Sequence, residues 1–217
     1  MPSPYINTVL NTRVTLEAAQ MENNIYNNLK TNLTRQLEGK CYRQYGFVTK
    51  IFSILEKGQG MILPENPLAS ATFKVKFTCK LCNPLKGTQI ICKIDKITSI
   101  LIGMISGPMR IIALPDQINK EVFYTDKNNN LKYKNKAGSL NIDKGMHAKI
   151  TILTKTFNDM DNLILVFAHL DDIATKDEIE KFYKEEYSNV EENILNFEEY
   201  ISNEKSTNNA LTEEPLE

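Results

Sequence analysis

Residues 71–79 read ATFKVKFTC, and this alternation decides the fold class of the first half of the chain. Phe73, Val75 and Phe77 fall on one face of an extended strand, whereas the two lysines between them fall on the other. A strand with one apolar and one charged face is typical of an antiparallel sheet that is buried on one side only. Another element must therefore cover the apolar face.

A helix over residues 16–38 is the candidate for that cover. Apolar residues recur there every four positions and form a single stripe, which is typical of a helix that packs on a sheet. Thr15 is a candidate N-cap, and Gly39 is a candidate C-terminal stop. The stripe consists of Met21, Ile25, Leu29, Leu33 and Leu37.

The segment between this helix and residue 71 supplies the remaining strands of the sheet. Residues 41–55 are rich in aromatic and β-branched side chains, and GQG at 58–60 marks a turn or a bulge. We therefore expect residues 1–83 to form an α+β domain in which one helix covers a small antiparallel sheet.

The second half of the chain reads as strand after strand. NPLKG at 83–87 combines a proline with a glycine, and we expect a domain boundary there. Five expected strands without a strong helix match the number of strands in a small closed barrel. Residues 84–175 are therefore expected to form an all-β OB-fold. The expected strands are 88–96, 101–106, 109–114, 147–156 and 163–170.

The end of the chain has the opposite charge from the rest. Residues 1–175 carry a formal net charge of +8, and residues 176–217 carry −9. Apolar residues at three-to-four spacing predict an acidic amphipathic helix over 176–205, and the polar residues 206–217 predict a disordered tail. A basic body with an acidic tail suggests two partners of opposite charge, and a merely solvated tail is the alternative.

No constellation of catalytic residues is evident. The chain contains no phosphate-binding glycine loop, no nucleophile elbow and no zinc-protease motif. Cys79 and Cys82 have CxxC spacing but lack the second pair of ligands that zinc requires. Asp171 and Asp172 are expected at a solvated strand end, on opposite faces. We expect neither an enzymatic activity nor a cofactor, and a nuclease on an OB scaffold is the remaining enzymatic alternative.

The barrel segment instead spreads basic and aromatic side chains over its expected strands. Proteins that bind single-stranded nucleic acid combine a basic groove with aromatic side chains on which bases stack. Alternating lysines can also be no more than the solvated face of a strand. The RNA-contacting candidates are Lys93, Arg110, Lys132, Tyr133 and Lys149.

The N-terminus shows no secretory signal, and no apolar run is long enough to span a membrane. We therefore expect an intracellular protein that does not contact a membrane.

Eight short segments carry a further signal through their order and spacing. They are LKTNLTRQLEGKC (29–41), YGFV (45–48), GQGMI (58–62), VKF (75–77), NPLKG (83–87), SGPM (106–109), GMHAKI (145–150) and LDD (170–172). Together they resemble the stalk subunit of multi-subunit RNA polymerases, a family that comprises the seventh subunit of eukaryotic polymerase II and its archaeal counterpart. The resemblance spans residues 12–175.

This resemblance implies a non-catalytic subunit with an N-terminal tip domain and a C-terminal OB-fold. The tip domain docks on the polymerase core near the RNA exit channel, and the OB-fold contacts nascent single-stranded RNA and transcription factors. A second small helical subunit usually lies across both domains. The residues that match the docking region of the family are Tyr45, Gly46, Phe47, Val48, Gly58 and Gly60.

Two departures from the family pattern stand out. The aromatic residue that family members often carry on the second OB strand is absent from residues 98–103, which predicts RNA binding driven mainly by phosphate contacts. The acidic helix over 176–205 exceeds the usual length. One hypothesis is that it replaces the helical partner subunit on the stalk. The alternative is a tail that folds on another partner.

The competing interpretation of function is a free-standing OB-fold protein that binds RNA in translation. The helix-and-sheet unit ahead of the barrel favours the polymerase subunit. The composition, rich in Asn, Ile and Lys, favours a viral transcription enzyme. Such a subunit would lie in the virion or in a cytoplasmic viral factory, and otherwise in the nucleus.

Overall fold

The structure is a computed structural model that describes residues 3–62, 69–98, 100–125, 131–135 and 138–184. The chain divides into two compact units, residues 1–175 and residues 176–217. The helices and strands of the first unit are β1 (Tyr5–Leu16), η1 (Ala18–Gln20), α1 (Ile25–Leu37), β2 (Lys40–Tyr42), β3 (Gly46–Ile62), β4 (Ala71–Cys82), β5 (Gln89–Ile97), β6 (Ile102–Ser106), β7 (Met109–Ala113), η2 (Pro115–Gln117), β8 (Phe123–Thr125), β9 (Leu131–Asn135), β10 (Gly138–Asn141), β11 (His147–Thr156) and β12 (Ile164–Ile173).

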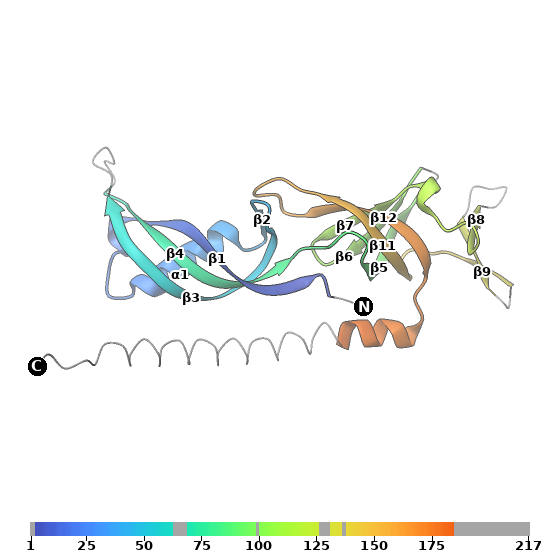
Figure 1. The fold of residues 1–217 in the computed structure, drawn as a ribbon, viewed down its shortest axis with the longest axis horizontal. Coiled ribbons are helices and arrows are strands. Elements are labelled where there is room, and N and C mark those ends of the chain that lie inside the picture. Colours follow the sequence, from blue (N-terminus) through green and yellow to red (C-terminus); the bar gives the residue numbers. More distant parts are fainter. Residues whose placement is uncertain (1–2, 63–68, 99, 126–130, 136–137, 185–217) are drawn as a thin grey trace, which may run out of the picture. The chain divides into compact units, whose positions relative to one another are not determined.

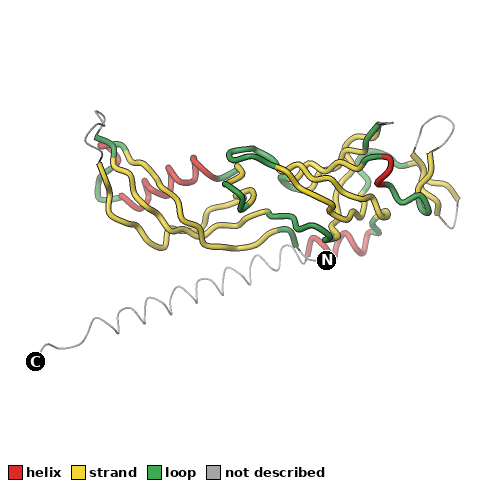
Figure 2. Tube along the Cα trace, turned by 45° about the horizontal axis from the view of Figure 1, so that its top comes forward, coloured by secondary structure: helices red, strands yellow, loops and turns green. Residues whose placement is uncertain are grey.

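The tip domain, as we name β1–β4 with α1, is an antiparallel sheet with strand order β1-β4-β3-β2 and a helix along one face (Figure 1). Figure 2 shows α1 running beside the strands of this sheet. Leu29, Leu33 and Leu37 of α1 are fully buried against alternate residues of the strands, such as Val14 and Phe77. The predicted α+β unit, one helix on a small antiparallel sheet, is confirmed.

The predicted start of the helix is wrong. Residues up to Leu16 belong to β1, which pairs with β4 along its whole length, and α1 begins only at Ile25. Thr15 is therefore a strand residue that pairs with Thr72, not an N-cap. The physical reason is the period-two pattern ahead of residue 16, which buries Leu10, Val14 and Leu16 against α1 and β4.

The barrel, as we name the five strands β5, β6, β7, β11 and β12, is closed in the order β11-β12-β7-β6-β5. Antiparallel pairs form most of the ring, and the parallel pair of β12 with β7 closes it. All five predicted strands are present, and the OB-like five-stranded barrel is confirmed. Its interior is lined by buried side chains that include Ile90, Met104, Ile111, Ile150 and Val166.

A small antiparallel sheet of β8, β9 and β10 is inserted between β7 and β11, in the order β10-β9-β8. Tyr133 of β9 pairs with Phe123 of β8, and their ring centroids lie 5.6 Å apart. The insertion is therefore held by its own aromatic contact.

The joint at residues 83–87 lies between the last strand of the tip sheet and the first strand of the barrel. The boundary between residues 83 and 84 stays a prediction. In the second unit, residues 176–184 are helical. The remainder of the expected helix to residue 205 and the expected tail over 206–217 lie outside the described residues.

The tip domain and the barrel meet at the loop between β11 and β12. The amide of Cys41 donates a hydrogen bond to the carbonyl of Asp161 at 2.7 Å, and the amide of Met160 donates to the carbonyl of Cys41 at 2.8 Å. The amide of Arg43 donates to Oδ1 of Asp159 at 2.7 Å. These three hydrogen bonds join the edge strand β2 of the tip sheet, and the residue after it, to the β11–β12 loop of the barrel.

Candidate nucleic-acid interface

The outer wall of the barrel brings together two of the predicted RNA-contacting residues. Lys93 on β5 lies opposite Ile105 on β6, and Ile105 lies opposite Arg110 on β7. The residues before and after Lys93 are buried inside the barrel, so its side chain points outward. Lys93, Ile105 and Arg110 therefore form one row across three strands, with a partly exposed apolar side chain between two cations.

One carboxylate lies within this positive wall. Asp95 is 2.9 Å from Nζ of Lys144 and 3.8 Å from Nη1 of Arg110. The hydrogen bond from Lys144, together with the charges of Lys144, Arg110 and Lys93, lowers the pKa of Asp95. These groups are solvent-exposed, so the pairs contribute little to stability. Three cations around one carboxylate leave this part of the wall with net positive charge.

Lys149 lies on the same side of the barrel. It is two residues along β11 from His147, which pairs with Lys93 across the β5–β11 ladder. Burial and the neighbouring charge of Lys93 lower the pKa of His147, which disfavours the charged imidazolium. Three of the five predicted RNA contacts thus share one surface of strands β5, β7 and β11.

The other two predicted contacts lie elsewhere. Lys132 and Tyr133 are neighbours on β9, in the inserted sheet, and neighbouring residues of a strand point to opposite faces. Burial, and then the hydrogen bond and the charge of Asp172, raise the pKa of Tyr133. Tyr133 therefore ties the inserted sheet to β12, and its ring already packs on Phe123.

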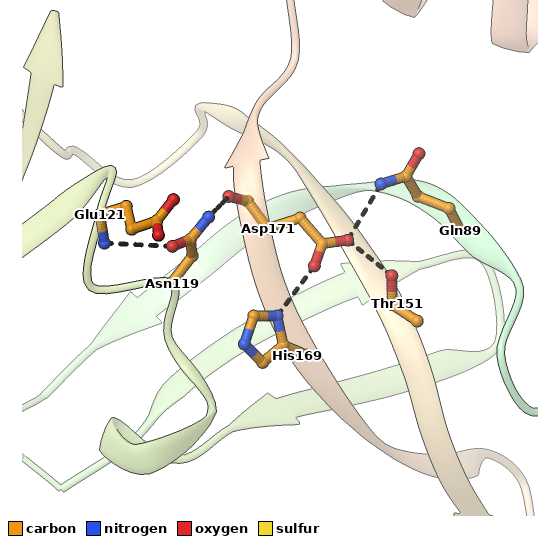
Figure 3. A network of polar contacts seen from close by, with 6 residues as sticks. All are labelled: Gln89, Asn119, Glu121, Thr151, His169 and Asp171. Atoms are coloured by element: carbon orange, nitrogen blue, oxygen red, sulfur yellow. Dashed lines mark hydrogen bonds and ion pairs between the residues drawn. The ribbon is translucent and has the colours of Figure 1, made fainter.

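Asp171, near the end of β12, is part of a hydrogen-bond network (Figure 3). Asp171 accepts bonds from Thr151 Oγ1 at 2.6 Å, from Gln89 Nε2 at 3.0 Å and from His169 Nδ1 at 2.8 Å. Its backbone carbonyl accepts a bond from Asn119 Nδ2 at 3.3 Å. Burial alone would raise the pKa of Asp171, but the three side-chain hydrogen bonds outweigh it and lower the pKa.

The expectation of a solvated strand end is therefore wrong for Asp171. Its carboxylate joins β5 and β11 to β12, and its carbonyl holds the loop that leads into the inserted sheet. Asp172 bonds instead to Tyr133. Carboxylates whose oxygens already accept hydrogen bonds from the protein have a structural role. In the described part of the chain, no group of His, Cys, Asp and Glu is arranged to hold a metal ion.

The predicted polymerase-docking residues fall into two groups at opposite ends of β3, which is 17 residues long. Val48 is fully buried in the tip core. Gly46 has a φ of +130°, and a Cβ there would lie 2.5 Å from the carbonyl oxygen of Cys82. Phe47 is partly buried, and Tyr45 is 46% exposed and stacks on Tyr42. Of these four residues, Tyr45 is the most exposed.

At the other end of β3, the glycines make room for neighbouring side chains. A Cβ at Gly60 would lie 2.6 Å from the ring of Phe73, and Gly58 lies against the backbone of Lys74. The predicted bulge is present as a shift in register between Lys57 and Gly60. Beyond it, Met61 and Ile62 are 56% and 54% exposed. The sequence signal for these two residues is their place directly after the GQG bulge.

The four cysteines are buried thiols, and none forms a disulfide. Burial raises the pKa of Cys79 to about 12. Burial and the charges of Asp161 and Asp159 raise the pKa of Cys41 to about 11. Thiols with pKa values this high are protonated at neutral pH, which makes them poor nucleophiles. Within the residues described, no helix has the length and apolarity to cross a membrane.

Comparison with known proteins gives the chain its family. No protein-family model matches it. A protein of Acanthamoeba polyphaga mimivirus, named as a DNA-directed RNA polymerase subunit, is 33% identical over 200 residues, which cover 92% of this chain and 98% of the mimivirus protein. Subunit RPB7 of soybean RNA polymerase II is 26% identical over 153 residues, or 69% of this chain and 83% of RPB7. The chain belongs to the RPB7 family of RNA polymerase subunits.

The RPB7 relationship extends to fungi. RPB7 of Saccharomyces cerevisiae is 23% identical over 124 residues, which cover 56% of this chain and 71% of the yeast protein. RPB7, to which the chain is homologous, is a non-catalytic subunit. The predicted resemblance to the seventh subunit of polymerase II is confirmed, and a viral relative exists.

Proposed function

We propose that this chain is the stalk subunit of a DNA-directed RNA polymerase, anchored through its tip domain near the RNA exit channel and contacting nascent RNA through its barrel. The observation that carries the RNA contact is the row of Lys93, Ile105 and Arg110 on the outer wall of a closed barrel. Cations on such a wall can bind phosphates, and the partly exposed Ile105 can contact a base or a ribose.

The RNA contact is expected to be electrostatic and indifferent to sequence. Tyr133, the aromatic candidate, is engaged with Phe123 and Asp172, which leaves phosphate contacts as the main source of affinity. Affinity should therefore fall steeply with salt. Lys149, on the same side of the barrel, would extend the contact by one more phosphate.

The anchor is proposed at the end of β3 that carries Met61 and Ile62. Both side chains are more than half exposed, although they are apolar. Exposed apolar side chains at the end of a sheet are typical of a surface that a partner covers. Gly58 and Gly60 act indirectly here because they let β3 bulge beside Lys74 and Phe73. From the predicted docking residues 45–48, at the other end of β3, we propose that Tyr45 also contacts the polymerase core.

The proposal implies partners beyond the core subunits. A small helical stalk subunit and transcription factors are expected to bind the same chain, as in the family that it resembles. If the polymerase is viral, the complex is expected in virions or in cytoplasmic viral factories, and otherwise in the nucleus.

Affinity capture of the tagged full-length chain, followed by mass spectrometry, tests the anchor. The wild type should bring down the large polymerase subunits, and Met61→Ser/Ile62→Ser should lose most of them. Ile6→Ser is the matched control, because Ile6 is 49% exposed elsewhere in the tip domain. Capture of ribosomal proteins or initiation factors in place of polymerase subunits would favour the alternative role in translation.

Titration of an unstructured, fluorescently labelled RNA at several salt concentrations tests the barrel contact. Each phosphate contact contributes about 0.7 to the slope of log affinity against log salt for a single strand. Lys93→Gln/Arg110→Gln should therefore reduce that slope by about 1.4. Lys86→Gln/Lys120→Gln, at two exposed lysines in loops, should leave it unchanged. Equal slopes for all three proteins would overturn the barrel contact.

A further inference from the structure

The face of the tip sheet opposite α1 is the feature from which we draw a further inference. Alternation within each strand separates the two faces. Phe73, Val75 and Phe77 of β4 lie in the core under α1, so the residues between them point to the opposite side, which we call the outer face. The same alternation buries Leu10 and Val14 of β1, and their odd-numbered neighbours point outward.

The outer face is strongly basic. The three strands β1, β3 and β4 contain a single acidic residue, Glu56. Glu56 pairs with Lys76, and Nζ and Oε1 lie 2.8 Å apart. The outward cations of these strands are Arg13, Lys50, Lys74, Lys76 and Lys80. The face thus carries five cations and one carboxylate.

The register of the sheet arranges these cations in a track along β4. Lys74, Lys76 and Lys80 follow one another on β4, with steps of two or four residues. Arg13 lies opposite Lys74 on one side, and Lys50 lies opposite Lys80 on the other. Two residues of a strand span about 6.8 Å, so the cations are spaced along a line rather than gathered at one point.

Most side chains between the cations are small hydrogen-bonding groups. Asn7 and Asn11 of β1 occupy outward positions, with the partly buried Val9 between them, and the buried hydroxyl of Thr78 lies 3.0 Å from that of Ser53. A stable protein interface needs an apolar centre, and the partly buried Val9 is too small to supply one. Phosphates and riboses are bound by this mixture of cations, amides and hydroxyls.

The track runs toward the barrel. Nζ of Lys80 lies 4.7 Å from the centre of the Tyr5 ring. The Tyr5 hydroxyl in turn lies against Gly107, where a Cβ would overlap it. Gly107 is the turn between β6 and β7, three residues before Arg110. The basic track therefore ends beside the turn that leads into the basic wall of the barrel.

We propose that the outer face of the tip sheet is a second RNA-binding surface, which binds the phosphates of single-stranded RNA without regard to sequence. The inference rests on the proposed function, because it lengthens the path of the RNA that contacts the barrel. A strand bound to the row of Lys93 and Arg110 continues past Tyr5 onto Lys80, Lys50 and Lys74.

The test uses full-length variants that leave the buried face of the sheet untouched. Lys50→Gln/Lys74→Gln removes two exposed outward cations, and Lys30→Gln/Arg35→Gln removes two exposed cations from α1, on the opposite side of the sheet. With a long unstructured RNA, the first variant should reduce the salt slope of binding by about 1.4, and the second should not change it. Circular dichroism and melting temperature should match the wild type in both.

The outcomes separate the inference from the proposed function. If Lys93→Gln/Arg110→Gln reduces the salt slope of RNA binding but Lys50→Gln/Lys74→Gln does not, the barrel contact stands and the proposed RNA-binding surface on the tip sheet is wrong. If neither variant reduces the salt slope, both proposals fail. Polyglutamate serves as an acidic polypeptide probe. If Lys50→Gln/Lys74→Gln loses affinity for polyglutamate but keeps its affinity for RNA, the outer face binds an acidic protein instead.

Discussion

The tip domain and the barrel solve the same problem, the burial of one face of a sheet, in two different ways. The barrel closes its five strands on themselves, so each inner row is covered by the other strands. The tip sheet stays open, and α1 covers its inner face. Core burial in the barrel is therefore shared among five strands, whereas in the tip domain it depends on one helix of 13 residues.

The comparison extends to the outer surfaces. Because each sheet buries mainly one side, many outward positions of its strands are available for charged side chains. In the barrel these positions hold Lys93 and Arg110, and in the tip sheet they hold Arg13, Lys74 and Lys80. A stalk built from two half-buried sheets can therefore present basic residues along both domains without disturbing either core.

The largest effect is expected where the tip domain depends on α1. Leu33→Ala should destabilise the protein by about 2–5 kcal/mol, because a fully buried leucine leaves a cavity between α1 and the sheet. Chemical denaturation measures the loss, and hydrogen exchange locates it. Amides of β4 should lose protection, whereas amides of β11 and β12 should keep theirs.

The control for this change is Lys30→Ala, an exposed position of the same helix. Its effect should stay within about 0.5 kcal/mol. Equal loss of protection in β4 and β12 after Leu33→Ala would mean that the two cores unfold as one, contrary to the comparison above.

An intermediate effect is expected where the two domains meet. Gly107 has a φ of +55°, and a Cβ there would overlap the Tyr5 hydroxyl, so Gly107→Ala should cost about 1–3 kcal/mol. Adding Tyr5→Phe removes the overlapping oxygen and should recover part of the loss. Thermal denaturation of both single variants and the double variant measures this coupling.

Gly87→Ala is the matched control, because Gly87 has a φ of +80° and no atom within 4 Å of the Cβ position. Its cost should be about 1 kcal/mol, from backbone strain alone. If Tyr5→Phe brings no recovery at Gly107, the contact between the tip strand and the barrel turn is not the source of the cost.

The smallest effect is expected at the network on β12, which strengthens the barrel alone. Asp171→Asn should cost about 1–2 kcal/mol at neutral pH, because it weakens hydrogen bonds to a charged acceptor. The folded state lowers the pKa of Asp171, so its stabilisation is present above the unfolded-state pKa of about 4. It is lost as the pH falls through the lower pKa of the folded state.

The melting temperatures of the wild type and Asp171→Asn should therefore converge on acidification. Asp116→Asn, at an exposed carboxylate, should follow the wild type at every pH. A gap between wild type and Asp171→Asn that stays constant down to acid pH would indicate that the carboxylate charge has no part in the network.

Much of the fold could be predicted from local patterns. The alternation around Phe73 predicted the tip sheet, the stripe of Leu29, Leu33 and Leu37 predicted its helix, and five β-rich segments predicted the barrel. The start of the helix was mispredicted, because residues 5–16 also alternate and find a partner in β4, more than 50 residues away in sequence. Local periodicity does not reveal such a partner.

The candidate site was predicted less completely. Lys93, Arg110 and Lys149 were expected as RNA contacts and do share one wall of the barrel. Tyr133 was expected as a stacking platform, but its hydroxyl and ring already have partners within the protein. The docking residues near Val48 are mostly buried, whereas the exposed Met61 and Ile62 were not singled out. The burial of a residue depends on which elements pack against it in the tertiary structure, and the spacing of residues in the sequence does not reveal this.

The sequence by itself determined which side chains share a face, because the period of a strand or a helix is a local property of the backbone. It thereby determined the basic alternation of β4 and the apolar stripe of α1. Only the tertiary structure decided which strands are neighbours, through register and barrel closure. That decision set Lys93 beside Ile105 and Arg110, and it brought Tyr5 to Gly107, because long-range pairing depends on the packing of whole sheets.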